Sequence, residues 1–152
     1  YRELLNPLDL NYLLDYALYY LNNKKEFNSE NEIYCFIRLY KVLDKNYQRK
    51  MENEITKAIS QLIEKKQEKW NEYVPKPLDF VPKADSFRFG IPKSLILNHL
   101  EYMIAMIENN GVINPPWGEK FYDGDMEVAY NEWKGILTLK ALRRLQNYGF
   151  IF

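Results

Sequence analysis

Apolar residues recur every three or four positions along most of this chain, the spacing that gathers them on one face of an α-helix. Alternating apolar and polar positions, which are typical of a strand, are nearly absent. The pattern therefore predicts an all-α fold built from antiparallel helical hairpins. Five helices are expected, over residues 7–22, 29–43, 47–73, 92–110 and 125–148.

Residues that favour helix ends mark several of these boundaries. Asn6 precedes a proline at the first helical position, where the missing N–H costs nothing, so we expect Asn6 to cap the first helix. Ser29 begins the sequence "SENE", and Glu32 three residues later completes the pattern of a capping box for the second helix. Gly111 and Gly149 follow the last two helices and are expected to end them.

The predicted helices differ in how much of their surface is apolar. The third has one apolar stripe, which includes Met51, Ile55 and Ile59, and charged residues cover the rest, so it should lie on the outside. The other four are apolar on more than one face, as in "YALYYL", "YCFIRLY", "LILNHLEYMIAMI" and "GILTLKAL". Because such helices need cover on several sides, we expect layers in which some helices are enclosed by others.

The chain has the length of one domain, and we expect a single helical domain over residues 1–152. Within it, residues 1–73 hold the N-terminal helices and residues 92–152 a helical hairpin. Residues 74–91 are rich in proline, which argues against a regular element, and their aromatic side chains favour a loop that wraps over the helices. Because the sequence begins with Tyr1 rather than Met, we expect a fragment of a longer helical protein.

Charge and cysteine content argue against several classes of function. Lys and Arg together number 21, as do Asp and Glu, so the basic surface of a nucleic-acid-binding protein is not expected. The single cysteine, Cys35, excludes an internal disulfide and a zinc site built from thiolates. No secretion signal is recognisable, and the apolar run from Leu8 to Leu21 is interrupted by polar residues and too short to span a bilayer. A cytoplasmic protein without a membrane span is therefore expected.

The turn between the last two predicted helices has an unusual composition. Residues 109–121 read "NNGVINPPWGEKF", with two glycines, two adjacent prolines and Trp117, and "EWKGILTLKALRRLQNYGFI" follows. The first sequence resembles the turn of α/α-toroid repeats, as in squalene cyclases and protein prenyltransferases, where a tryptophan closes the turn between an outer and an inner helix. The second is similar to uncharacterised bacterial proteins that carry such helical repeats. The resemblance covers residues 65–152 and implies a partial α/α-toroid-like assembly.

The catalytic groups of the enzymes with this fold have no counterpart here. Terpenoid cyclases use clustered acids, as in DxDD or DDxxD, to protonate an olefin or hold diphosphate through magnesium, and no such run occurs. Protein prenyltransferases hold zinc with Asp, Cys and His, whereas Cys35 and His99 are the only residues of their types. Phosphate-binding glycine-rich loops are absent as well. No catalytic motif is recognisable and no cofactor is expected, so the resemblance implies a fold rather than those reactions.

Five residues are candidates for contact with a ligand. The ring of Trp117 either packs across the ends of the last two helices or lines a pocket. Glu132 and Trp133 lie near the start of the last helix, where Glu132 is either an exposed residue or, on an inner helix, a buried carboxylate facing a lumen. His99, among leucines in the fourth helix, is either a structural residue or a catalytic base. Tyr122, in the turn region, completes the set.

The acids of "YDGDMEV" alternate along the chain, which suggests a metal site. An EF-hand loop counted from Asp123 would need Gly at its sixth position and Glu at its twelfth, where the sequence has Val128 and Lys134. We interpret these acids as caps of the first helical turn, whose free N–H groups and dipole favour negative charge. No metal site is expected.

Three functions follow from these observations. The first is a helical-repeat domain that binds an unidentified small molecule or a protein through a concave aromatic face. The second is a terpenoid cyclase- or prenyltransferase-like enzyme that uses lumen acids such as Glu132. The third is a structural helical domain that forms a homodimer through its aromatic surface. Tyrosines suit each of them, because they supply apolar area with a polar tip, and four crowd the first helix: Tyr12, Tyr16, Tyr19 and Tyr20.

Overall fold

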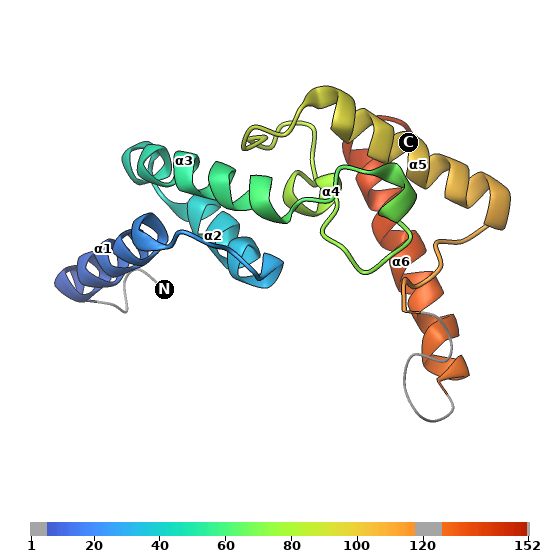
Figure 1. Ribbon diagram of the computed structural model, residues 1–152, viewed down its shortest axis with the longest axis horizontal. Helices are drawn as coiled ribbons and strands as arrows, with labels where there is room; N and C mark the ends of the chain where they lie inside the picture. The colour runs from blue at the N-terminus through green and yellow to red at the C-terminus, as the bar shows by residue number, and fades with distance from the viewer. Residues whose placement is uncertain (1–5, 118–125, 152) are drawn as a thin grey trace. The chain divides into compact units, whose positions relative to one another are not determined.

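The structure is a computed structural model that describes residues 6–117 and 126–151. Over these residues the chain forms six α-helices and one 3₁₀ turn, with no residue in a strand (Figure 1). The all-α prediction is therefore confirmed for the part of the chain that the structure describes. The chain divides into two compact units, Tyr1–Leu62 and Ile63–Phe152.

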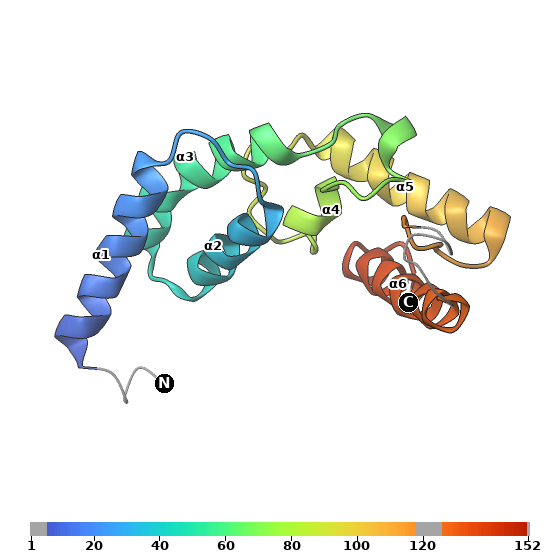
Figure 2. The ribbon, with the colours of Figure 1, turned by 60° about the horizontal axis from the view of Figure 1, so that its bottom comes forward.

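The first unit contains three helices, α1 (Pro7–Asn23), α2 (Glu30–Val42) and α3 (Lys45–Leu62). Helix α3 packs against both α1 and α2, and adjacent helices run antiparallel (Figure 2). The predicted stripe of α3 is confirmed, because its apolar side chains are almost fully buried. These side chains share one core with residues of the other two helices: Leu14, Leu18, Leu21, Ile33, Ile37, Met51, Ile55 and Ile59.

One of the two predicted helix caps forms and the other does not. The side chain of Asn6 accepts a hydrogen bond from the Leu8 N–H at 3.0 Å and caps α1 as expected. Ser29 occupies the cap position of α2, but its side chain makes no capping hydrogen bond. The capping-box prediction is wrong because Glu32 is engaged elsewhere: its carboxylate pairs with Lys24, at the end of α1.

The third helix is shorter than the sequence predicts. The chain leaves the helix after Leu62 and later makes the 3₁₀ turn η2 (Gln67–Lys69). The ring of Trp70 then packs on His99 with ring centroids 4.7 Å apart, and its Nε1 donates to the Glu64 carbonyl at 3.0 Å. Burying a tryptophan gains more free energy than the few tenths of a kcal/mol per residue that helix propensity contributes, so the tertiary contact decides where the helix ends.

The second unit contains η2, α4 (Pro77–Phe80), α5 (Lys93–Asn110) and α6 (Glu127–Asn147), with α5 in contact with the other three. The turn α4 corrects the prediction that residues 74–91 hold no regular element. It forms because its proline lies at the first helical position, where no N–H is needed, and because Phe80 is buried. Of the three phenylalanines of this segment, Phe80 and Phe89 are at most 3% exposed, whereas Phe87 is 47% exposed.

Two glycines end the last two helices as predicted. Gly111 has a φ of 72° and follows the last residue of α5, with its N–H bonded to the Ile107 carbonyl at 2.8 Å. Gly149 has a φ of 74° just beyond α6. Both lie in the left-handed region, which a residue with a Cβ adopts only at a cost, so the chain must turn out of the helix there.

The expectation that the most apolar helices are enclosed by others is wrong within each unit. Helices α1 and α6 are each covered along one face, and large apolar side chains remain exposed on the other. Each unit has three described α-helices, so a helix has at most two α-helical neighbours within its unit and keeps an outer face. Among the described residues, no helix has both the length and the hydropathy needed to cross a membrane.

Candidate functional site

An exposed row of large side chains runs along α1. Leu8, Tyr12, Tyr16 and Tyr20 are spaced by four residues, so they follow one another along one side of the helix. We call these four residues the α1 row. Their exposed fraction falls from 76% at Leu8 to 42% at Tyr20. The α1 row lies away from the buried leucines of the same helix, and it therefore belongs to the surface of the unit and not to its core.

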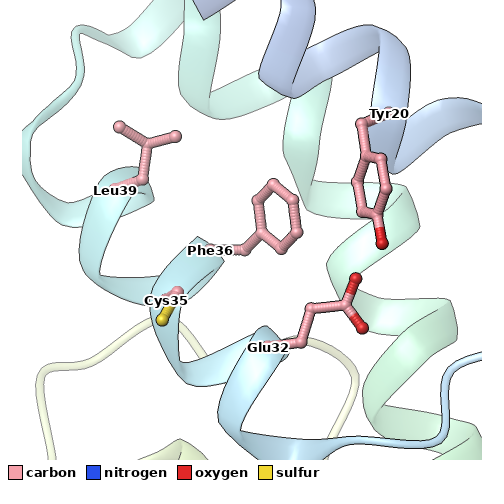
Figure 3. A pocket seen from close by; sticks show the side chains of 5 residues that line it. All are labelled: Tyr20, Glu32, Cys35, Phe36 and Leu39. Atoms are coloured by element: carbon pink, nitrogen blue, oxygen red, sulfur yellow. The ribbon is translucent and has the colours of Figure 1, made fainter.

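The α1 row ends at an open hollow of about 400 Å³ beside α2 (Figure 3). The rings of Tyr20 and Phe36 stack there with centroids 6.2 Å apart and an interplanar angle of 15°. Tyr20 is the only contribution of α1 to the lining, and α2 supplies the rest. Most of this surface is apolar, and the residues that form it are Tyr20, Glu32, Cys35, Phe36 and Leu39.

Lys24 neutralises the carboxylate of the hollow. Its Nζ donates to both oxygens of Glu32, at 2.8 and 2.7 Å, and to the hydroxyl of Tyr20 at 3.0 Å. The hydrogen bond to Glu32 raises the pKa of Lys24. Partial burial is the largest single influence on Glu32 and raises its pKa, but the hydrogen bonds from Lys24 and Tyr20 and the charge of Lys24 together outweigh it, so the pKa of Glu32 is lowered. Both groups stay charged at neutral pH, and together they hold Tyr20 at the edge of the hollow.

The charged residues of α1 are all acidic. The helix contains Asp9 and Asp15 and has neither lysine nor arginine between Pro7 and Asn23. Asp9 lies one residue after the start of the α1 row, and Asp15 lies between two of its tyrosines along the chain. The row is thus an aromatic surface with negative charge beside it.

The second unit has a polar cluster that links its helices. Arg144 of α6 donates to Oδ1 of Asp79 in α4 at 2.6 Å, while Oδ2 accepts from the Lys76 N–H at 2.9 Å. Burial opposes the charge on Asp79, but Arg144, Lys140 and the Lys76 N–H outweigh it and lower the pKa of this carboxyl. Tyr148 adds a bond from its hydroxyl to the Val81 carbonyl at 2.7 Å. Each group already has a structural partner, so this cluster holds α4 in place.

His99, one of the sequence candidates, is buried in the same unit. Its Nδ1 accepts a hydrogen bond from the Leu78 N–H at 3.3 Å, which requires a neutral ring. Burial is the main cause that lowers its pKa from 6.5 to about 3. With the side chain 2% exposed, no solvent-borne substrate reaches it in this conformation. The arrangement matches the structural alternative that the sequence left open.

The remaining candidates lie around the start of α6. Trp117 is half-buried and meets the ring of Trp133 edge-on, with centroids 5.3 Å apart. The same turn is tied to α6 by the Ile113 N–H, which donates to the Thr138 hydroxyl at 2.9 Å. Glu132 is exposed, as in the exposed alternative. Tyr122 lies outside the described residues, as do Asp123 and Asp125 of the acidic segment.

The described residues bring few titratable groups together. Within residues 6–117 and 126–151, no three His, Cys, Asp or Glu side chains are arranged to hold a metal ion. The hollow contains one carboxylate, which Lys24 occupies, and an exposed thiol at Cys35. An acid and base pair for catalysis is therefore not among the groups that line it.

Sequence reasoning found part of this surface and missed the rest. The tyrosines of α1 were visible in the sequence as a cluster, but the four-residue spacing of Tyr12, Tyr16 and Tyr20, which places them on one side of the helix, was not used. The ion pair of Lys24 with Glu32 was missed, because Glu32 also fitted a capping box. Phe36 and Leu39 were missed as lining residues, since apolar residues at helical spacing are usually assigned to a core.

Comparisons with known proteins leave the family open. No protein-family model matches the chain, and neither a curated protein nor a solved structure matches it.

Proposed function

We propose that this protein is a helical protein-binding module whose α1 row and adjoining hollow hold a basic, amphipathic helix of a partner. The observation that carries the proposal is the α1 row: four large side chains in a line, exposed along the whole helix. Exposed apolar side chains that adjoin one another are typical of protein interaction sites, whereas single ones are common on any surface.

The geometry suits a helix as the bound element. An amphipathic helix presents anchors at every third or fourth residue, and the α1 row offers contact points at the same spacing. Tyrosine rings have few rotatable bonds, so they lose little conformational entropy when they become ordered against a partner. Two helices that pack side by side would bury the row along its length.

The charges around the row select a basic partner. Asp9 and Asp15 attract Lys and Arg, and α1 contains no basic side chain that would repel them. Tyrosine faces also attract cations, a contact worth roughly 0.5–1 kcal/mol at an exposed site. Within the unit, Lys24 already lies 5.2 Å from the centroid of the Tyr20 ring, which shows that a cation fits beside this row.

The hollow would receive an apolar anchor of the partner helix. Tyr20 belongs both to the α1 row and to the lining of the hollow, so the two form one continuous surface. Phe36 and Leu39 supply apolar contact, and the pairing of Glu32 with Lys24 leaves no uncompensated charge to bury. A leucine or methionine side chain fits this chemistry.

The enzyme alternative requires different features. A terpenoid cyclase- or prenyltransferase-like enzyme within an α/α-toroid would need an enclosed pocket with at least two acids that do not serve as helix caps or ion-pair partners. The hollow described above is open and has one carboxylate, already paired. Glu132, the lumen acid of that hypothesis, is exposed. The binding function is therefore the better supported of the two.

A fluorescein-labelled 18-residue peptide tests the proposal directly. The peptide carries leucines along one face and arginines on the flanks, and a matched peptide replaces every arginine with glutamate. We expect fluorescence anisotropy to show binding of the arginine peptide and at least tenfold weaker binding of the glutamate peptide. The double variant Tyr12→Ala/Tyr16→Ala should weaken binding of the arginine peptide by at least tenfold.

Tyr73→Ala is the matched control, because Tyr73 is as exposed as the tyrosines of the α1 row but lies in the second unit. It should leave binding unchanged, and both variants should keep the melting temperature of the parent. Equal binding of the two peptides, or equal binding by the parent and the double variant, would refute the proposal.

A further inference from the structure

The outer face of α6 contains large apolar side chains that no described residue covers. The helix buries one side through Ala141 and Leu145. On the opposite side, at about 100° per residue, Ile136 and Leu139 fall together, 51% and 50% exposed. Leu142 and Val128 extend this surface toward the two ends of the helix, and both are exposed. A soluble helix normally places polar residues on such a side.

Gly135 lies within this face, and no described residue of the chain explains why it is a glycine. A Cβ built on it meets no atom within 4 Å, so no neighbour forces the residue to be small. Glycine inside a helix costs about 1 kcal/mol relative to alanine. Close approach of a second helix would explain its presence, because only a small residue lets two backbones come near each other.

The charges on the same face are arranged in a self-complementary way. Glu132 lies toward the N-terminal end of α6 and Arg143 toward its C-terminal end, and both are exposed on the side of Ile136 and Leu139. Neither makes an ion pair with any residue that the structure describes, in contrast to Arg144, which is bound to Asp79. A second α6 that runs antiparallel brings unlike charges together, whereas a parallel one would oppose like charges.

We infer that the outer face of α6 is a homodimer interface on which a second copy of this chain packs its own α6 antiparallel. One register satisfies both the apolar and the charged positions. When Ile136 lies opposite the partner's Leu139, Glu132 lies opposite the partner's Arg143, because both pairs are centred between Leu137 and Thr138. Twofold symmetry repeats each contact, which doubles its contribution to the interface.

This interface is independent of the function proposed above. It lies in the second unit, whereas the α1 row and its hollow belong to the first. Its partner is the same chain rather than a basic helix of another protein. Peptide binding by α1 and self-association through α6 can therefore succeed or fail separately.

Charge exchange across the interface provides the test. Sedimentation velocity of the 152-residue chain over a range of concentrations at low ionic strength should show a monomer–dimer equilibrium. Glu132→Arg and Arg143→Glu should each weaken dimerisation by at least tenfold, because each opposes like charges twice. A mixture of the two single variants should dimerise as the parent does, since every charged pair is then unlike again. The double variant should recover for the same reason.

Glu101→Arg is the matched control, because Glu101 is an exposed acid on α5 of the same unit and undergoes the same change in charge. It should leave dimerisation unchanged. Leu139→Arg should abolish the dimer through its apolar centre, and circular dichroism should confirm that every variant is folded.

Several outcomes would overturn the inference. A parent protein that stays monomeric at several hundred micromolar is one, and a dimer that is insensitive to these substitutions is another. Failure of the mixed variants to associate would exclude the antiparallel register. If the parent is monomeric and a thiol reagent modifies no more thiol in Leu139→Cys than in the parent, whose Cys35 is exposed, the face is covered by the chain itself and the homodimer is wrong.

Discussion

Arg144 on α6 donates to Asp79 in α4 at 2.6 Å, across a separation of 65 residues. Both side chains are mostly buried, with exposed fractions of 13% and 19%. The contact therefore fastens the last helix of the second unit to the single turn that the proline-rich segment contributes. Removing one partner would leave the other charge buried without compensation, which costs more than the pair itself gains.

Arg144→Gln should accordingly destabilise the protein by about 3 kcal/mol, within the range found when one member of a buried pair is removed. Lys140→Gln is the matched control: Lys140 approaches the same carboxylate at 3.8 Å, but its side chain is 55% exposed. We expect that change to cost about 0.5 kcal/mol or less. Urea unfolding followed by circular dichroism measures both. Equal effects of the two substitutions would contradict the assignment of the Asp79 charge to Arg144.

The buried His99 should make stability depend on pH in a defined window. Its pKa is about 3 in the folded protein, chiefly because burial disfavours the imidazolium, against 6.5 for the free side chain. As the pH falls below 6.5, the unfolded chain binds a proton that the folded chain does not, so the free energy of unfolding decreases. The slope is about 1.4 kcal/mol per pH unit, and from pH 7 to pH 5 the loss should reach about 2 kcal/mol.

His99→Gln separates this effect from other titrations. Glutamine keeps an acceptor for the Leu78 N–H but does not titrate, so the variant should lose much less stability between pH 7 and pH 5. The carboxyl of Asp79 remains ionised in this window, since its pKa lies below 3.8. Urea unfolding at half-unit pH intervals gives the two slopes. A parent and a variant with parallel pH profiles would show that His99 gains a proton in the folded state.

Two glycines should respond to alanine in opposite directions. A Cβ at Gly135 or at Gly111 meets no atom within 4 Å, but only Gly111 has a positive φ, of 72°. Gly135→Ala should therefore stabilise the monomer by about 1 kcal/mol through helix propensity. Gly111→Ala should destabilise it by about 1 kcal/mol, because alanine is strained in the left-handed region. Thermal unfolding at low concentration checks both signs, and stabilisation by Gly111→Ala would be inconsistent with its role at the end of α5.

Features that depend on neighbours along the chain could be predicted from the sequence. Asn6 caps α1, Gly111 ends α5, and the buried stripe of α3 lies at the expected spacing, because each depends on residues within one or two turns. The crowding of tyrosines in the first helix was visible for the same reason. Helical periodicity acts locally, so it survives without knowledge of the rest of the fold.

Features that depend on residues far apart in the chain could not be predicted. Helix α3 ends at Leu62 rather than continuing through Trp70, which packs on His99 instead, and no pattern around Trp70 indicates that partner. Glu32 had two uses compatible with the sequence, and the approach of Lys24 decided between them. Only the folded chain brings Lys24 close enough to Glu32 to form this ion pair.

The amino-acid sequence by itself determined that this protein is helical, where most of its helices begin and end, and which face of α3 is buried. The tertiary structure decided which apolar faces are covered and which remain on the surface. The physical reason is that an apolar stripe in the sequence shows only that its side chains are more stable away from water. The number and position of the neighbouring helices decide whether that tendency is satisfied, and the described residues leave the α1 row and the outer face of α6 exposed.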